Sequence, residues 1–123
     1  MKMKDRIKEL KRVKASELMP NPKNWRTHPI AQKNALSSVL DSIGYADAVL
    51  ARETDDGLML IDGHMRAELT PEEEIPVLVL DVTEKEADLL LATHDPISAM
   101  AGKDDLILKN LLKDITAESE PLN

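Results

Sequence analysis

The chain has 123 residues, 42% of them hydrophobic, which suits one domain with one core and leaves no room for a second. The absence of cysteine excludes disulfides, thiolate zinc sites and a cysteine nucleophile, and the net charge of −7 argues against indiscriminate binding to nucleic acid. The sequence has no run of 18 apolar residues and no apolar signal-peptide centre, so we expect a soluble, cytoplasmic protein without a membrane partner.

The amino-terminal third is basic, although the chain as a whole is acidic. Residues 1–33 hold ten Lys and Arg against three acidic residues, and residues 34–123 hold six against twenty. This split predicts a basic arm over residues 1–12, either a loose helix or without regular structure; the alternative is a solvated charged lead-in. Nonspecific contacts to DNA would then fall on Lys11, Arg12 and Lys14.

The next segments predict a strand, a loop and a helix. Residues 13–18 (VKASEL) alternate apolar and polar side chains, which indicates a short strand, and MPNPKNWRTHP holds three prolines, which indicates a loop. A helix is expected to start at Pro29 with His28 as its cap and to end at Gly44. Its buried face would consist of apolar residues at helical spacing: Leu36, Val39, Leu40 and Ile43.

The central part of the chain predicts a β-hairpin and a buried strand. Residues 48–53 and 58–62 flank an Asp-Gly turn and form the hairpin, and residues 75–82 (IPVLVLDV) are apolar enough for a central strand.

Two helices are expected in the remainder. Thr83 and Glu86 form a capping box for a helix over residues 84–93, which Asp95 and Pro96 should end. A second helix is expected over residues 104–115, followed by a polar tail, residues 116–123, that suits a linker to a further domain. The order of the elements predicts an α/β fold with a small mixed sheet flanked by helices.

The stretch LIDGHMRAEL (residues 60–69) changes from a strand pattern to a helix pattern at Gly63. The first amides of such a helix lack intrahelical partners and attract anions, so Gly63 and Arg66 are candidates to hold phosphate. His64 would add a hydrogen bond or exchange a proton, and Asp62 would cap the helix or hold a metal ion or a ribose hydroxyl. The alternative is an ordinary glycine turn beside a surface Arg and His.

The proline-rich loop gathers a second set of polar and aromatic side chains, namely Asn21, Asn24, Trp25, Arg26 and His28. Trp25 is the one tryptophan of the chain and would stack on a base or, alternatively, fold back onto the edge of the core. The three histidines are scattered, at 28, 64 and 94, so we expect no metal site built by the protein.

In this order, the motifs NPKNWRTHP, LSSVLDSIG, IDGHMRAEL, IPVLVLD and TEKEADLLL resemble the ParB/sulfiredoxin superfamily over residues 13–115. The greatest resemblance is to the ParB-like "nuclease" domains of phages, plasmids and methyltransferase-linked genes. It implies a single ParB/sulfiredoxin-like domain that binds a nucleoside triphosphate, CTP or ATP, with Mg²⁺. Sulfiredoxin activity itself is excluded, because its chemistry needs a cysteine.

The resemblance implies a nucleotide site built from two boxes. The family's first box, Asn-Pro-x-Gln-Pro-Arg, corresponds to Asn21, Pro22, Asn24 and Arg26; the second, Gly-Glu-Arg-Arg, corresponds to residues 63–66. His64 replaces the acidic residue and Met65 replaces the first arginine, which removes one phosphate ligand. The free-serine kinases of the superfamily carry Asp-Gly-His-His-Arg here, which Asp62, Gly63, His64 and Arg66 match.

We therefore expect a domain of a phage- or plasmid-type DNA-transaction protein that binds nucleotide or DNA phosphate at the DGHMR turn. Its candidate ligand-binding residues come from both boxes: Asn21, Asn24, Arg26, Asp62, Gly63, His64 and Arg66. His64 is the candidate for proton exchange. The alternatives are a nucleotide-dependent enzyme of the same fold (NTPase, free-serine-kinase-like or nuclease) and an adaptor for a DNA methyltransferase or partition partner, with a partner domain expected beyond residue 115.

Overall fold

The computed structural model describes residues 2–99, 106, 107, 109–111 and 113. The chain divides into two compact units, Met1–Ala92 and Thr93–Asn123, and the candidate site lies wholly within the first.

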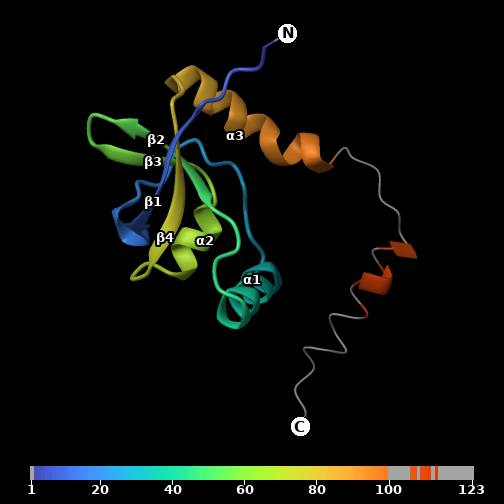
Figure 1. Cartoon of the computed structure of the whole chain (residues 1–123). Helices are drawn as coiled ribbons and strands as arrows, with labels where there is room; N and C mark the ends of the chain where they lie inside the picture. The colour runs from blue at the N-terminus through green and yellow to red at the C-terminus, as the bar shows by residue number, and fades with distance from the viewer. Residues whose placement is uncertain (1, 100–105, 108, 112, 114–123) are drawn as a thin grey trace. The chain divides into compact units, whose positions relative to one another are not determined.

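A four-stranded mixed sheet forms the centre of the first unit (Figure 1). Its strands are β1 (Ile7–Lys14), β2 (Val49–Thr54), β3 (Gly57–Asp62) and β4 (Glu74–Leu80), in the order β1-β4-β2-β3. β1 pairs antiparallel with β4, β2 pairs antiparallel with β3, and β2 runs parallel to β4. The predicted small mixed sheet and the interior position of the IPVLVLD strand are both confirmed.

The amino-terminal elements differ from the sequence prediction. The segment expected to be a loose basic helix or irregular is strand β1, and the strand expected over residues 13–18 is instead the end of β1 followed by a 3₁₀ turn, Ala15–Glu17 (η1). Segment 7–14 is a strand because its backbone pairs with β4 along its length. This pairing is a tertiary interaction, and the local pattern of apolar residues does not predict it. Just after η1, the backbone of Met19 pairs with Met59 of β3.

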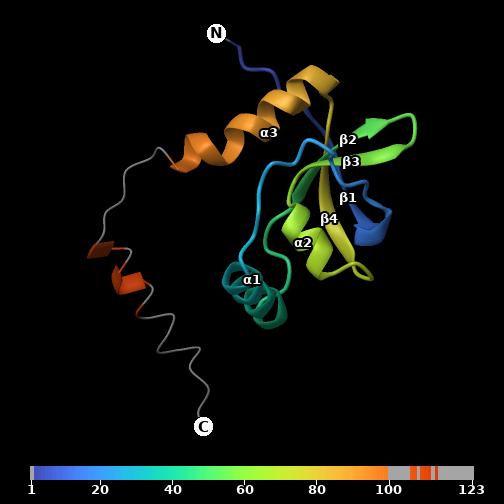
Figure 2. The ribbon, with the colours of Figure 1, turned by 180° about the vertical axis from the view of Figure 1, so that it is seen from behind.

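The first helix, α1 (Ile30–Ser42), begins one residue later than expected, with Pro29 rather than His28 at the N-cap. None of its residues is fully buried: Val39 is 50% exposed and Ile43 is 72% exposed. The apolar spacing predicted the helix correctly and its burial wrongly, because α1 packs mainly on the short helix α2 (His64–Leu69), which leaves much of its surface exposed (Figure 2).

Helix α3 spans Glu84–Ala99 and continues past Asp95 and Pro96, where the sequence predicted its end. A proline removes one backbone hydrogen bond and kinks a helix, but neighbouring turns can carry the helix through. Its capping box is confirmed, since the Glu86 N–H donates to Thr83 Oγ1 at 3.1 Å and the Thr83 N–H donates to Glu86 Oε1 at 2.9 Å. Of the helix predicted over residues 104–115, residues 106, 107, 109–111 and 113 are helical and the others lie outside the described residues.

The two faces of the sheet carry separate apolar clusters. One is centred on alternate residues of β4, namely Ile75, Val77 and Val79, and is covered by η1 and by Ala67 of α2. The other joins Ile61 of β3 to Ala87 and Leu91 of α3. The candidate site lies where the loop after η1 meets the end of β3 and the start of α2.

Candidate functional site

Gly63 forms the turn between β3 and α2 and has the left-handed backbone conformation, with φ of +95°. A Cβ at this position would overlap the side chain of Val49 in β2, whose own Cβ would lie at 2.7 Å. Glycine is therefore required both by the backbone angle and by close packing against β2. Gly63 is also the N-cap of α2, so Asp62 does not cap the helix as the sequence had allowed.

His64, the first residue of α2, is 5% exposed. Its Nε2 accepts a hydrogen bond from the backbone N–H of Asn21 at 3.1 Å, so in the neutral ring the proton sits on Nδ1. Burial lowers the pKa of His64, and the nearby positive charge of Arg26 lowers it further. The imidazole thus joins the second box to the first while it is neutral.

The proline-rich loop is ordered by its own side chains. Asn21 Oδ1 accepts from the Lys23 N–H at 2.9 Å, and the Asn24 N–H donates to the Asn21 carbonyl at 3.0 Å, which makes a tight Asn turn. Asn24 Oδ1 accepts from the Arg26 N–H in a long contact of 3.4 Å. His28 lies outside this turn, with its Nδ1 3.1 Å from Gln32 Oε1 of α1.

Arg26 forms the second connection between the boxes. Its Nη1 donates to Asp62 Oδ1 at 2.7 Å, and the two side chains are only 10% and 23% exposed. Because both charges are largely removed from water, this ion pair is screened less than one at the surface. The pair therefore fixes the NPKNWR loop to the end of β3.

Trp25 lies beside this ion pair, with its ring centre 5.4 Å from the guanidinium carbon of Arg26. Its Nε1 donates to the carbonyl of Leu91 in α3 at 3.1 Å, while the residue as a whole is 54% exposed. The indole is thus held by its polar edge and leaves part of its surface open to solvent.

Arg66 extends toward a different partner from Arg26. Its Nη2 lies 3.7 Å from Asp47 Oδ2, and the Asp47 side chain is 74% exposed, so this ion pair is loose. Arg66 also lines a groove of about 150 Å³ with the carboxyl-terminal end of α1 and residues 44–47. Its guanidinium is therefore the more available of the two arginines for an external anion.

Tyr45 is a site residue that the sequence reading missed. Its hydroxyl donates to the Arg66 carbonyl at 2.9 Å and contacts Thr70 Oγ1 at 2.5 Å, so it ties the middle and the C-cap of α2 to the segment after α1. The sequence feature that could have indicated Tyr45 is that it is the one tyrosine in a chain with almost no aromatic residues.

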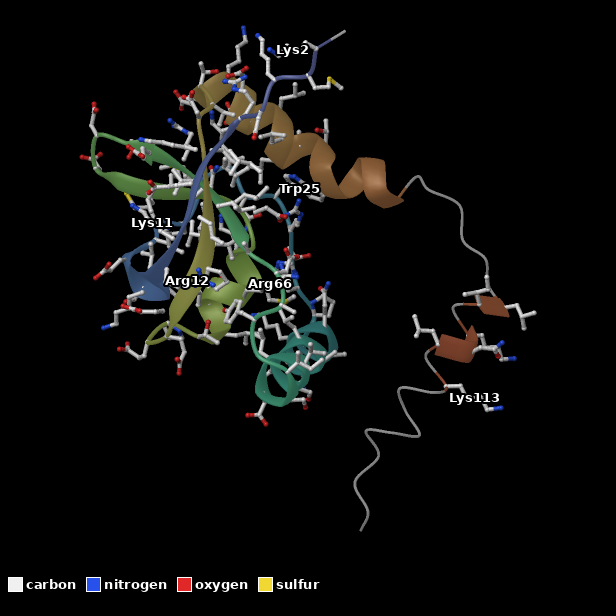
Figure 3. The ribbon with its side chains drawn as sticks, in the orientation of Figure 1. Lys2, Lys11, Arg12, Trp25, Arg66 and Lys113 are labelled. Carbon is white, nitrogen blue, oxygen red and sulfur yellow. The ribbon has the colours of Figure 1, made fainter. Side chains whose placement is uncertain are left out.

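The basic residues proposed for DNA belong to β1 and its surroundings rather than to a free arm. Lys14 pairs with Glu72 at 3.1 Å and Lys11 with Glu9 at 3.5 Å, while Arg12 is exposed on the same strand (Figure 3). Other bases of this third are paired as well: Arg6 with Glu86, Lys8 with Glu53, and Lys23 with Asp88. Acidic partners therefore offset much of the local excess of positive charge.

Two further findings concern the described residues alone. Within them, no three His, Asp or Glu side chains gather closely enough to hold a metal ion. No helix among them has both the length and the apolar character needed to cross a membrane.

No protein-family model matches this sequence, and no curated protein matches it either. Solved structures do match. A truncated chromosome-partitioning protein ParB from Caulobacter crescentus, complexed with CTP-γ-S, aligns at 14% identity with a TM-score of 0.71, over 89% of this chain and 63% of its own. A Pnob8-like ParB-N domain aligns at 15% identity with a TM-score of 0.63, over 96% of this chain and 52% of its own.

Sulfiredoxin from Arabidopsis thaliana also aligns, at 14% identity with a TM-score of 0.56, over 68% of this chain and 97% of its own. The chain thus spans about half to two thirds of the two ParB chains and almost the whole of the sulfiredoxin. Identities this low establish the arrangement of the backbone and nothing finer. The chain has a ParB/sulfiredoxin-like fold.

Proposed function

We propose that this chain is a ParB-like domain of a phage- or plasmid-type DNA-transaction protein, and that it binds the phosphates of a nucleoside triphosphate at the DGHMR turn. One observation carries the proposal: the two boxes, more than 30 residues apart in sequence, are joined by the Arg26–Asp62 ion pair and the Asn21–His64 hydrogen bond. A structure of the same fold holds CTP-γ-S, which supports the choice of a nucleotide as ligand.

Arg66 is the phosphate ligand in this proposal. Its side chain is 31% exposed, and the ion pair that its guanidinium makes among the described residues is the long one to Asp47, so an anion can displace that carboxylate at little cost. Asn24 and Arg26 close over the nucleotide, and the open part of the Trp25 ring offers a surface on which a base can stack. Asn21 and Asp62 position the loop, each through the contact described above.

The geometry supports a positioning role for His64 over the exchange of protons with a ligand. Its Nε2 is occupied by the Asn21 N–H, and the ring is almost completely buried. Gly63 acts through its backbone, because the turn requires a residue without Cβ. Any Mg²⁺ would enter with the triphosphate, whose oxygens are the ligands that this ion prefers.

The test is a thermal-unfolding series with CTP, ATP, ADP and GTP in Mg²⁺, on the wild type, Arg66→Ala and the matched control Lys85→Ala. Lys85 is an exposed basic residue of α3 away from the turn. A bound nucleotide at a hundred times its dissociation constant stabilises the native state by about 2.7 kcal/mol. We expect one nucleotide to stabilise the wild type and Lys85→Ala, and Arg66→Ala to lose that gain.

Binding of duplex DNA, measured at low and high salt, tests whether the phosphate that the chain binds belongs to DNA or to a nucleotide. DNA binding that falls steeply with salt and survives Arg66→Ala, together with no stabilisation by any nucleotide, would place the phosphate contacts on the basic residues of β1 and refute the nucleotide site. A wild type that no nucleotide stabilises would also refute it.

A further inference from the structure

The two edges of the sheet differ in how much of their backbone is already paired. On the β3 edge, the Met19 N–H donates to the Leu58 carbonyl at 2.8 Å and the Leu60 N–H donates to the Met19 carbonyl at 2.9 Å. β1 is the opposite edge and pairs with β4 on its inner side. An uncovered edge strand presents a row of N–H and C=O groups that can pair with another chain.

The register identifies which groups of β1 face outward. The Ala15 N–H donates to the Glu73 carbonyl, and hydrogen-bonded pairs in an antiparallel ladder recur every second residue, so Val13 and Lys11 bond to β4. Leu10, Arg12 and Lys14 therefore direct their backbone groups away from β4. Pro76, which has no N–H, lies opposite Arg12 and agrees with this assignment.

No hydrogen bond among the described residues reaches the outward backbone groups of Leu10, Arg12 or Lys14. The register is regular over these five residues, since the bulge in β1 lies between Ile7 and Glu9. A segment of five regular residues is long enough to accept a short extended peptide.

The side chains of the same three residues share one face of the sheet, because alternate residues of a strand point to the same side. Leu10 is 50% exposed, Arg12 is exposed, and the ion pair that Lys14 makes among the described residues is a surface pair with Glu72, whose side chain is 79% exposed. The open edge thus combines one apolar position with two cationic ones.

We infer that the open edge of β1, from Leu10 to Lys14, binds an acidic extended peptide by β-strand addition. The peptide runs antiparallel to β1 and carries acidic residues opposite Lys14 and Arg12 and an apolar residue opposite Leu10, in the pattern acidic-x-acidic-x-apolar. Opposite charges directly across a strand pair stabilise it and like charges destabilise it. A second copy of the same edge would bring the cations of two β1 strands together, so charge complementarity favours a foreign acidic partner.

The probe is a fluorescent seven-residue peptide, Thr-Glu-Thr-Glu-Thr-Leu-Thr, with blocked ends. We expect saturable binding that weakens with salt and drops at least tenfold when both Glu are replaced by Lys. Arg12→Glu should weaken binding at least tenfold, whereas the matched control Lys85→Glu should leave it unchanged, because Lys85 lies on α3.

Two measurements distinguish backbone hydrogen bonding of the peptide to β1 from electrostatic attraction alone. N-methylation of the peptide at its Glu and Leu residues should abolish binding, and N-methylation at the intervening Thr residues should be tolerated. In the protein, the amides of Leu10, Arg12 and Lys14 should exchange with solvent rapidly until the peptide is added, while those of Lys11 and Val13 are slow throughout.

The inference fails if the peptide does not bind, if both N-methylated forms bind equally, or if Arg12→Glu binds as the wild type does. It also fails if these three amides become protected without peptide as the protein concentration rises, since the edge would then pair with a second copy.

Discussion

Arg26 of the proline-rich loop and Asp62 at the end of β3 form an ion pair of 2.7 Å whose side chains are 10% and 23% exposed. The pair connects residues 36 apart in sequence and holds the loop against the strand that leads into α2. Its energetic contribution should differ from that of the exposed pairs elsewhere on the surface.

We predict that Arg26→Ala lowers the free energy of unfolding by about 3 kcal/mol, because it removes one partner of an ion pair whose side chains are largely shielded from water. Lys8→Ala removes an exposed pair with Glu53, in which both side chains are 52% exposed, and should cost far less. Urea denaturation measures both. A double variant with Asp62→Asn should recover part of the loss, and equal costs for the two single variants would contradict the buried role of Arg26.

The sequence predicted most elements of the fold but placed several of them in the wrong surroundings. Local signals were sufficient where the cause is local, as in the Asp-Gly hairpin and the Thr83–Glu86 capping box. They were insufficient for β1, whose strand state comes from pairing with β4, and for Ile43, whose exposure depends on what α1 packs against.

The site shows the same division. That the two boxes belong together followed from resemblance, yet the contacts that join them did not. Nothing in the sequence indicates that a buried His64 accepts a hydrogen bond from the Asn21 N–H, or that the Arg26 side chain pairs with Asp62 and does not extend into solvent. These pairings join residues 43 and 36 apart in sequence, so they are a property of the folded chain.

Unfolding should depend on pH through His64. Its pKa is lowered in the folded state, so the unfolded chain binds the proton more readily, and stability falls as the pH drops below about 6.5, the ordinary value, toward the folded pKa. Protonation also removes the acceptor for the Asn21 N–H. We expect His64→Gln, whose amide oxygen can replace that acceptor, to lose less stability than the wild type between pH 7 and pH 5. If the unfolding temperatures of the two proteins fall equally between pH 7 and pH 5, the pH dependence does not come from His64.

Gly63→Ala should be among the most destabilising single substitutions in the chain. The added Cβ meets Val49 and the residue must keep φ of +95°, two penalties that together cost about 2–5 kcal/mol. Gly44→Ala is the matched control, because Gly44 has φ of +87° but no atom within 4 Å of the added Cβ. Denaturant titration should give a cost of about 1–2 kcal/mol for the control. If both variants lose the same stability, close packing against β2 is not the reason for glycine at 63.

Glu86 should titrate far below an ordinary glutamate. Arg6 donates from both Nη atoms to its carboxylate at 2.8 Å and the Thr83 N–H donates to it as well, which lowers the pKa of Glu86 to about 2. The stabilisation that this carboxylate supplies is present at neutral pH and is lost as the pH falls from about 4.5 through about 2. Carboxyl-detected NMR titration measures the value directly. Arg6→Ala should raise the pKa toward the ordinary range, and an unchanged value would assign the shift to Thr83 alone.

Trp25 gives the proposed nucleotide site an optical readout, because it is the only tryptophan in the chain. Its indole is held by Leu91 and lies beside Arg26, while the residue is 54% exposed, so a base that stacks on it changes a single, assignable emission. We expect the nucleotide that stabilises the protein to quench this fluorescence with the same dissociation constant. Trp25→Leu should weaken binding by about 1–3 kcal/mol if the ring stacks on a base. Unchanged affinity in Trp25→Leu, together with lost affinity in Arg66→Ala, would mean that the site holds phosphate and leaves the base in solvent.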